Sequence, residues 1–373
     1  MTITDKIKIS AFGCWNTGCN NDSGQKSVSD EIKKKENQYN FMIILGDNYY
    51  PEKYKLSEEP KFSVKDIQST NMEKGFKCID NINLTRKLIM GNHDVEESVN
   101  QGCSVIKYQQ KLPWYDVKFP FAYEYHYIKN ESSYETVLIF YLETTMYRED
   151  VLQDCYLSLL NKTAEQLIID QHNFITETIK KTVTNSNLNL TKILFCGHEP
   201  LFMIREKKGR KQNIVIKKLL EHIFNEYKKN PKLNFTWICA DYHVYQNTKI
   251  THEDMIINQF ILGTGGGELD TLPITNEADF TDNEKQYKFN ILSNIIYNTE
   301  GIDISDTHQS LGLPAFGYGE ILIEIGNNIT HKFILTKLPV ANGGGINYKE
   351  KYLKYKFKYN ELLKNHKYKL FYF

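Results

Sequence analysis

The sequence predicts a layered α/β sandwich built on two sheets. Short apolar runs, typical of buried strands, alternate with segments whose apolar residues recur at helical spacing. Five of these runs end directly on polar side chains: ISAFGC at Cys14, FMIILGDNYY at Asp47, KLIMGNHD at Asn92, KILFCGHEP at His198 and FTWICADYH at Asp241. Ligands of an open α/β sheet bind beyond the carboxyl ends of the strands, so we expect these five ends to converge on one site.

The chain of 373 residues has the composition of an ordinary globular protein, with 41% hydrophobic and 25% charged residues. Lys and Arg together number 46, as do Asp and Glu, so overall charge favours neither nucleic acid nor an anionic membrane as a partner. No stretch of about 18 apolar residues occurs, so no transmembrane helix is expected. The N-terminal MTITDKIKIS lacks the apolar run of a secretory signal, and we expect no signal peptide.

The seven cysteines are scattered along the chain: Cys14, Cys19, Cys78, Cys103, Cys155, Cys196 and Cys239. An odd number at irregular spacing predicts no disulfide framework, although a loop thiol pair of Cys14 and Cys19 is an alternative. Cys196 and Cys239 lie within apolar runs, where buried free thiols are expected. These features favour a reducing, cytoplasmic compartment.

The first part of the chain predicts three strands around one helix. Apolar runs place strands at 7–13, 41–46 and 86–90, and residues 27–36 have a helical pattern. Residues 51–75 contain Pro51, Pro60 and many charges, so we expect an irregular segment there that covers the mouth of the site.

The rest of the chain predicts further strands and two helices. The aromatic alternation at 113–128 and the apolar run at 136–143 indicate strands of a second sheet. Helices are expected at 163–183 and at about 213–228, the latter after a basic loop, EKKGRK. Further strands are expected at 192–196, 234–239, 255–262, 318–325 and 331–337, with a long polar insert at about 270–310.

The GTGGG run at 263–267 has two interpretations. It lacks the GK[ST] ending of a phosphate-binding loop, and no amphipathic helix follows it directly. A glycine turn after a strand is therefore favoured over a nucleotide cradle.

The organisation predicted is a domain at 1–338 and, at 339–373, a glycine linker followed by a basic amphipathic helical tail. Tyr348, Tyr352, Tyr355, Tyr359 and Leu362 form one stripe on a helix. We expect this helix to lie on the domain or to mediate self-association, and the alternative is a basic surface for nucleic acid or anionic membrane. The tail resembles the Lys/Tyr-rich C-terminal segments of proteins from giant DNA viruses.

The side chains at the strand ends are suited to a dinuclear metal site. Asp47 is a hard oxygen ligand able to bridge two cations, and Asn92 offers a carbonyl oxygen. His198 and His243 offer imidazole nitrogens, and Tyr50 supplies a phenolate to a sufficiently acidic metal. This set suits Fe, Zn or Mn. Two such metals about 3.5–4 Å apart generate hydroxide near neutral pH and stabilise a displacement at phosphorus.

His93 and Asp94 follow Asn92 directly. As an imidazolium, His93 is a candidate acid that protonates a leaving alcohol. Asp94 is a candidate outer carboxylate that orients His93 or a neighbouring ligand. The structural alternatives are a helix-cap turn at 92–93, a turn carboxylate at Asp47, and histidines at 198 and 243 that make only structural hydrogen bonds.

Four of these motifs together resemble one family. GDNYY (46–50), GNHD (91–94), GHEP (197–200) and ADYH (240–243), in this order and spacing, resemble the calcineurin-like metallophosphoesterases. The tyrosine in GDNYY and the FGCWN start resemble the purple, or tartrate-resistant, acid phosphatase branch. The resemblance covers about residues 7–337. It implies a four-layer α/β/β/α sandwich of two mixed sheets that holds two metal ions.

The resemblance also implies a ligand set. One metal ion would be held by residue 14, Asp47, Tyr50 and His243, and the other by Asp47, Asn92, His198 and residue 241. The family has Asp where this chain has Cys14, and GHxH where it has Ala240–His243. A Cys14 thiolate favours Zn over Fe(III), whereas Asp241 favours Mn, Mg or Fe(II). The branch has a further histidine after its GH motif, for which this chain offers only Lys207 or Lys208.

The function expected is hydrolysis of a small phosphomonoester by attack of a metal-bound hydroxide at the dinuclear site. The main alternative is a catalytically impaired phosphoesterase fold kept as a binding protein, because Cys14 and Asp241 replace family ligands. A third interpretation is a nucleic-acid phosphodiesterase that uses the basic tail, which the neutral overall charge disfavours.

Overall fold

The structure is a computed structural model that describes residues 3–16, 19, 23–50, 71–95, 103–148, 154–207, 210–266, 270, 277–282, 285–292, 296–297 and 316–337. The chain divides into two compact units, Met1–Thr336 and Lys337–Phe373. All elements below belong to the first unit, apart from the last residue of the final strand. The predicted tail helix lies outside the described residues.

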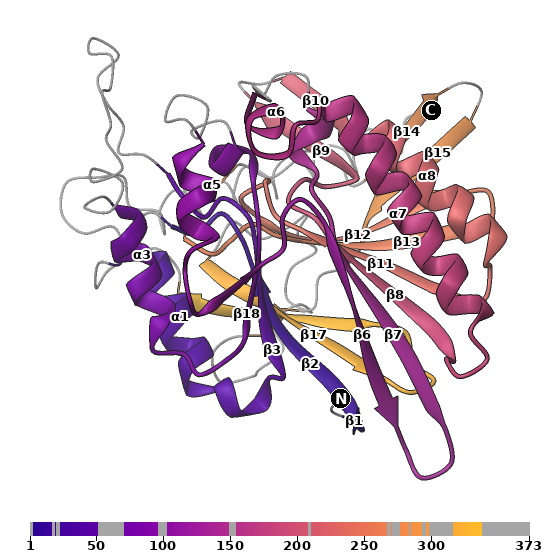
Figure 1. The fold of residues 1–373 in the computed structure, drawn as a ribbon, viewed down its shortest axis with the longest axis horizontal. Coiled ribbons are helices and arrows are strands. Elements are labelled where there is room, and N and C mark those ends of the chain that lie inside the picture. Colours follow the sequence, from indigo (N-terminus) through magenta and orange to yellow (C-terminus); the bar gives the residue numbers. More distant parts are fainter. Residues whose placement is uncertain are drawn as a thin grey trace, which may run out of the picture. The chain divides into compact units, whose positions relative to one another are not determined.

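Two mixed sheets organise the first unit (Figure 1). The larger sheet has the strand order β1-β6-β7-β8-β11-β13-β12-β15-β14. Its strands are Ile3–Thr4 (β1), Ala122–Lys129 (β6), Tyr134–Tyr141 (β7), Leu190–Cys196 (β8), Asn234–Cys239 (β11), Tyr245–His252 (β12), Met255–Leu262 (β13), Glu277–Asp282 (β14) and Lys285–Ile291 (β15).

The smaller sheet has the order β16-β18-β17-β2-β3-β4-β5. Its strands are Lys6–Phe12 (β2), Phe41–Leu45 (β3), Arg86–Ile89 (β4), Tyr115–Val117 (β5), Ile296–Tyr297 (β16), Phe316–Glu324 (β17) and Thr330–Lys337 (β18). The strands β2 to β5 run parallel, whereas β17 pairs antiparallel with β2. The larger sheet likewise contains a parallel block, β7-β8-β11-β13, with antiparallel neighbours on both sides.

The two sheets pack face to face between two layers of helices. One apolar cluster joins Ile9 and Ile43 of the smaller sheet to Ile139, Leu194 and Ile238 of the larger one. The outer face of the smaller sheet is covered by α1 (Gly24–Lys34) and α3 (Asn71–Asp80), and that of the larger sheet by α7 (Ala164–Thr184) and α8 (Lys217–Lys229). The predicted α/β sandwich of two mixed sheets is confirmed.

This layering explains why β3 is apolar throughout rather than alternating. In β3, Phe41, Ile43 and Leu45 face the other sheet, whereas Met42 and Ile44 face the helices α1 and α3. Parallel strands that are covered on both faces have few positions left for polar residues. In β3 the first polar side chain therefore comes after the end of the strand, at Asp47.

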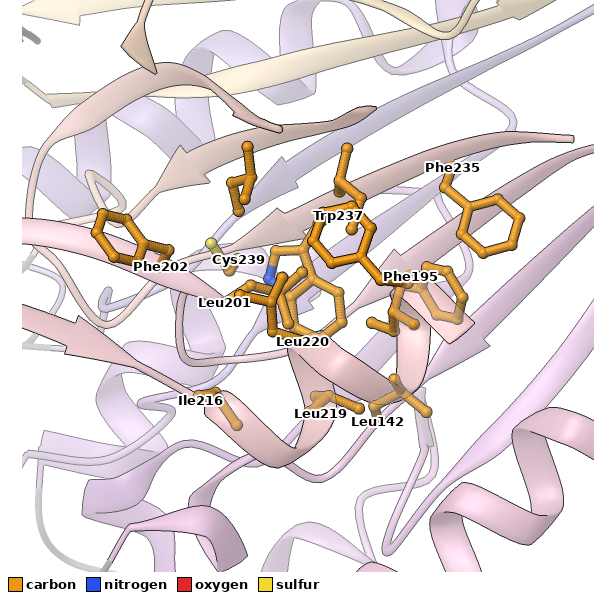
Figure 2. Close-up of a cluster of buried hydrophobic side chains, with 14 of the residues drawn as sticks. Leu142, Phe195, Leu201, Phe202, Ile216, Leu219, Leu220, Phe235, Trp237 and Cys239 are labelled. Atoms are coloured by element: carbon orange, nitrogen blue, oxygen red, sulfur yellow. The ribbon is translucent and has the colours of Figure 1, made fainter. Parts of the chain in front are cut away.

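The helix layer over the larger sheet is anchored by aromatic and branched side chains. Figure 2 shows Leu219 and Leu220 of α8 packed with Phe195 and Trp237 of the sheet. The longest helix, α7, begins with a capping box, in which Thr163 and Gln166 each accept from the other's backbone N–H. These contacts hold α7 and α8 against the sheet that carries His198 and Asp241.

Shorter elements complete the described residues. They are η1 (Glu36–Gln38), α5 (Ser104–Gln109), η2 (Thr145–Tyr147), α6 (Asp154–Leu160) and the hairpin of β9 (Phe202–Lys207) and β10 (Arg210–Val215). No helix within the described ranges is long and apolar enough to cross a membrane.

Several element predictions were wrong. The sequence predicts a basic loop and then the start of a helix at 213. The structure has the β9–β10 hairpin there, and α8 begins only at Lys217. The polar insert at 270–310 contributes β14, β15 and β16. Charged residues suggest loops there, but strand pairing satisfies the backbone groups whatever the side chains are; it is antiparallel for β9–β10 and β14–β15, and parallel for β16 with β18. The region 51–75 was expected to be irregular, yet α3 begins at Asn71, and residues 51–70 lie outside the described residues.

The prediction of no disulfide framework was also wrong. Cys19 pairs with Cys78 and Cys103 pairs with Cys155, each pair with a Cα–Cα distance of 5.6 Å. The partners are 59 and 52 residues apart, so no local spacing reveals them. The inference of a reducing compartment therefore loses its basis, and so does the alternative pair of Cys14 and Cys19. Cys196 and Cys239 are buried and free, as predicted.

Candidate metal centre

The strand ends of both sheets bring the candidate residues to one edge of the sandwich. Cys14, Asp47 and Asn92 follow β2, β3 and β4, which are parallel neighbours in the smaller sheet. His198 and Asp241 follow β8 and β11, which are parallel neighbours in the larger sheet. Parallel neighbours end at the same edge of a sheet, and the packing of the two sheets brings the two edges together.

Three of these strands end in the same unusual backbone conformation. Cys14, Asp47 and Asp241 have φ angles of 52°, 52° and 50°, in the left-handed region that side chains other than glycine rarely adopt. Each such residue costs about 1–2 kcal/mol, and strain of this kind gathers at functional sites. The repeated turn aims three acidic or thiol side chains across the edge rather than along their strands.

Two glycines permit the close approach of the smaller sheet to His198. A methyl group on Gly91 would lie 2.3 Å from the Asp47 nitrogen and 2.8 Å from Cε1 of His198. One on Gly46, which has a φ of 86°, would lie 2.6 Å from Nδ1 of His198. The glycines of GDN and GNHD are therefore required by packing around the imidazole.

A first group of donors surrounds one side of Asp47. The ligand atoms of Cys14, Asp47 and His243 all lie within 4.8 Å of one another. The Tyr50 hydroxyl donates to Asp47 Oδ2 at 2.7 Å and lies 3.2 Å from His243 Nε2. Sulfur, oxygen and nitrogen donors thus converge in a buried space, which is the arrangement that a metal ion requires.

A second group shares Asp47 with the first. Nε2 of His198 lies 3.2 Å from Asp47 Oδ1, 3.2 Å from Asn92 Oδ1 and 3.9 Å from Asp241 Oδ1. His198 Nδ1 is 2.6 Å from the Leu45 carbonyl oxygen, which can only accept, so Nδ1 carries the proton and the ring is fixed with Nε2 towards the group. The seven residues predicted as ligands therefore lie together, and Asp47 is the residue common to both groups.

His93 and Asp94 have different environments. The His93 ring lies 4.9 Å from the Tyr50 ring, and its backbone N–H donates to Asp47 Oδ1 at 3.2 Å. Asp94 is buried and accepts from the Gly91 nitrogen at 2.8 Å, the Asn48 nitrogen at 3.1 Å and Gln109 Nε2 at 2.8 Å. Asp94 thus joins the two loops that carry Asp47 and Asn92.

The buried charges at this edge stabilise one another. Burial alone would raise the pKa of Asp47, but the charge and hydrogen bond of His198 hold it well below its usual range. Burial alone would lower the pKa of His198, whereas the Asp47 carboxylate raises it well above its usual value. Without metal, Asp47 and His198 therefore form an ion pair, and a cation bound by Nε2 would replace the imidazole proton.

The pKa values of the Cys14 thiol and the Tyr50 phenol are both raised. Burial, followed by the negative charges of Asp47 and Asp241, raises the pKa of Cys14. Burial and Asp47 likewise raise the pKa of Tyr50. Both groups are thus protonated without metal, and ligation would require each to release a proton. A cation bound here would offset the burial and the negative charges that keep Cys14 and Tyr50 neutral, so the donor set is suited to metal.

The sequence did not reveal several residues that surround the ligands. Arg148 Nη1 lies 3.3 Å from Asp241 Oδ1, and the Asp270 carboxylate accepts from the backbone N–H of His243 at 3.1 Å. The Thr144 hydroxyl accepts from the backbone N–H groups of His198 and Glu199, each at 3.0 Å. It also donates to the buried Glu199 carboxylate. One signal was present, because YLETT after β7 has the same pattern of an apolar run that ends on polar residues. Lys207 and Lys208, considered as phosphate contacts, have no described side chain.

No protein-family model and no curated protein matches the chain. Among solved structures, it is similar to GAP50, the anchor in the inner membrane complex of Plasmodium, with a TM-score of 0.52 and 11% identity over 92% of this chain and 89% of that chain. It also aligns with TT1561 of Thermus thermophilus, with a TM-score of 0.32 and 10% identity over 76% of this chain and 98% of that chain. At such low identity, the likeness to GAP50 shows a similar fold and nothing about activity.

Proposed function

We propose that this chain is a metal-dependent phosphoesterase that hydrolyses a small phosphomonoester at a dinuclear site of Fe, Zn or Mn. One observation carries the proposal. Asp47 lies between two converging donor groups, one with Cys14 and His243 and the other with Asn92 and His198. A carboxylate in this position can bridge two cations, which is the arrangement used for displacement at phosphorus.

The residues divide between two metal positions. Cys14, Tyr50 and His243 would hold one ion, Asn92, His198 and Asp241 the other, and Asp47 both. When bound, such a pair of ions supplies Lewis-acid stabilisation of the phosphoryl oxygens and lowers the pKa of water at the site. Cys14, Asp47, Asn92 and His198 are buried, and electrostatic interactions are stronger in such a low-dielectric environment.

The proton for the leaving group would come from His93. Its ring lies beside Tyr50, and its backbone is tied to Asp47, so the imidazole is next to the shared ligand without being part of either donor group. An imidazolium there can protonate the departing alcohol. Asp94 holds the loop that carries His93 in place, because its carboxylate accepts from the backbone N–H groups of Gly91 and Asn48.

Elemental analysis of protein expressed with supplementary iron, zinc and manganese tests the proposal, together with a broad panel of phosphomonoesters. The expected result is close to two metal ions per chain and hydrolysis that a chelator abolishes. Protein that holds stoichiometric metal and hydrolyses no phosphoester would overturn the assignment.

A second candidate function is a binding protein with an impaired metal site. It is favoured by the replacements at Cys14 and Asp241, by burial of a neutral Cys14 thiol and by the ion pair of Asp241 with Arg148. GAP50, one solved structure with a similar fold, is itself described as an anchor. This alternative predicts little bound metal, and it predicts that the double variant Cys14→Asp/Asp241→His gains both metal and activity. A wild-type chain already active with two metals excludes it.

A further inference from the structure

Arg148 lies beside the second donor group. It follows η2, the short turn beyond the carboxyl end of β7, and β7 is the parallel neighbour of the strand that leads to His198. Its Nη1 is 3.3 Å from Asp241 Oδ1, which in turn is 3.9 Å from His198 Nε2. The Arg148 side chain is 27% exposed, whereas that of Asp241 is 11% exposed. The guanidinium therefore lies between solvent and the buried ligands.

The surroundings of Arg148 are strongly acidic. Asp241 contacts it, and the buried Glu199 lies close enough for the Arg148 charge to oppose the effect of burial on the pKa of Glu199. Asp47 and Asp270 add further carboxylates around the donor groups. Two divalent ions bring four positive charges, and Cys14, Asp47, Tyr50 and Asp241 as anions would offset all four. A phosphomonoester dianion would then need a further cation nearby.

We propose that Arg148 binds a phosphoryl oxygen of the substrate while Asp241 holds the guanidinium in place, and that this contact favours monoesters over diesters. The inference rests on the proposed function, because it assigns a substrate contact at the same site. A guanidinium is always charged and presents five N–H donors in a planar fork, so it can hold a carboxylate and a phosphoryl oxygen at once. A monoester dianion carries one more negative charge than a diester, so it gains more from this contact.

A purely structural ion pair would behave differently. If Arg148 served only to hold Asp241, its loss would lower metal content, and the substrate would be affected only through the metal. If Arg148 binds the phosphoryl group, its loss weakens phosphate binding and raises KM while metal content stays the same. The two roles are therefore separated by measuring metal and phosphate independently.

The test uses the full chain loaded with metal, with inorganic phosphate as the probe. Arg148→Gln removes the charge, Arg148→Lys keeps the charge without the fork, and Lys162→Gln is a control that breaks the surface ion pair with Asp170. Phosphate Kd is measured by calorimetry, metal content by elemental analysis, and KM and kcat with a matched phosphomonoester and phosphodiester.

We expect Arg148→Gln to raise the phosphate Kd and the monoester KM about ten- to hundredfold, as for loss of a charge-assisted hydrogen bond. The diester KM should change less. The phosphate Kd and monoester KM of Arg148→Lys should lie between those of Arg148→Gln and wild type, and those of Lys162→Gln should equal the wild-type values. Unchanged phosphate Kd in Arg148→Gln, or a change that tracks lost metal, overturns the inference and leaves the proposed function standing. Arg148-dependent phosphate binding without hydrolysis of any ester supports the inference and overturns the proposed function. Wild-type protein that binds no phosphate overturns both.

Discussion

Two buried histidines show how differently the edge of the sandwich and its interior treat the same side chain. His198 lies at the edge with Asp47, whose charge raises the pKa of the imidazole well above its usual value. His331 of β18 lies between the sheets, stacked on the Phe260 ring at 3.8 Å with the Tyr245 hydroxyl 2.5 Å from Nε2. Burial there lowers the pKa of His331 to about 3.

The contrast follows from what each region can offer a charged group. Between the sheets, side chains such as Ile9, Ile43 and Leu194 fill the space, and a cation would lose its hydration without gaining an anion. At the strand ends, carboxylates and backbone groups are available, and the left-handed turns aim them at one another. At the edge that carries the candidate metal centre, burial is therefore compatible with charge.

Asp47→Asn should break this contrast most completely. Without the carboxylate, the pKa of His198 in the metal-free protein should fall towards the depressed range of His331, because only the charges of Glu199 and Asp241 remain to oppose burial. Both donor groups lose their common ligand, so activity should fall by more than the roughly 100-fold that loss of an outer-shell partner costs. The imidazole pKa is measured by NMR titration, and metal by elemental analysis. Retention of two metals and a high His198 pKa would contradict the bridging role.

His93→Gln should lower kcat by about 10²-fold while leaving metal content unchanged, because proton donation is lost and no ligand is. The loss should be large for an alkyl phosphate, whose alcohol must be protonated, and small for 4-nitrophenyl phosphate, whose phenolate leaves unaided. Equal losses for the two substrates would exclude His93 as the proton donor. A fall in metal content would instead assign it to the donor groups.

His331→Phe tests the effect of burial on the histidine between the sheets. The folded pKa of about 3 lies below the ordinary value of 6.5, so the stability that this group contributes is fully present above pH 6.5 and is lost as the pH falls towards 3. Between these two pH values the free energy of unfolding falls by up to about 1.4 kcal/mol per pH unit. The variant should remove this slope, although loss of the Tyr245 hydrogen bond lowers stability by a pH-independent amount. Urea unfolding of metal-free protein between pH 7 and 4 checks this, and parallel profiles for variant and wild type would refute it.

Much of the edge could be predicted from the sequence. The part of a strand that is covered on both faces is largely apolar, so the first polar residue after the apolar run marks the sheet edge, as Asp47 does after β3 and His198 after β8. The two-sheet α/β sandwich followed from the same runs. The interior gave no comparable signal, because His331 lies in a run, THKFILTK, whose alternation does not show whether the histidine is buried or exposed.

Other features depended on contacts between distant segments. The disulfides Cys19–Cys78 and Cys103–Cys155 join residues more than 50 positions apart. The β9–β10 hairpin, in a segment for which the sequence predicts a loop and a helix, depends on pairing between its strands and on packing of Phe202, Met203 and Ile204 in the core. Arg148 had no motif of its own, and its proximity to Asp241 follows from the order β7-β8-β11 in the larger sheet.

By itself, the sequence determined which side chains stand at the strand ends, because the periodicity of buried strands and the chemistry of their terminal residues are local properties. The tertiary structure decided how those ends meet. It placed donor groups on both sides of Asp47, one of them His198 from the other sheet. It also placed Arg148 next to Asp241. Distances between side chains on different sheets depend on how the layers pack, and the pKa shifts of Asp47, His198 and His331 depend on those distances and on burial.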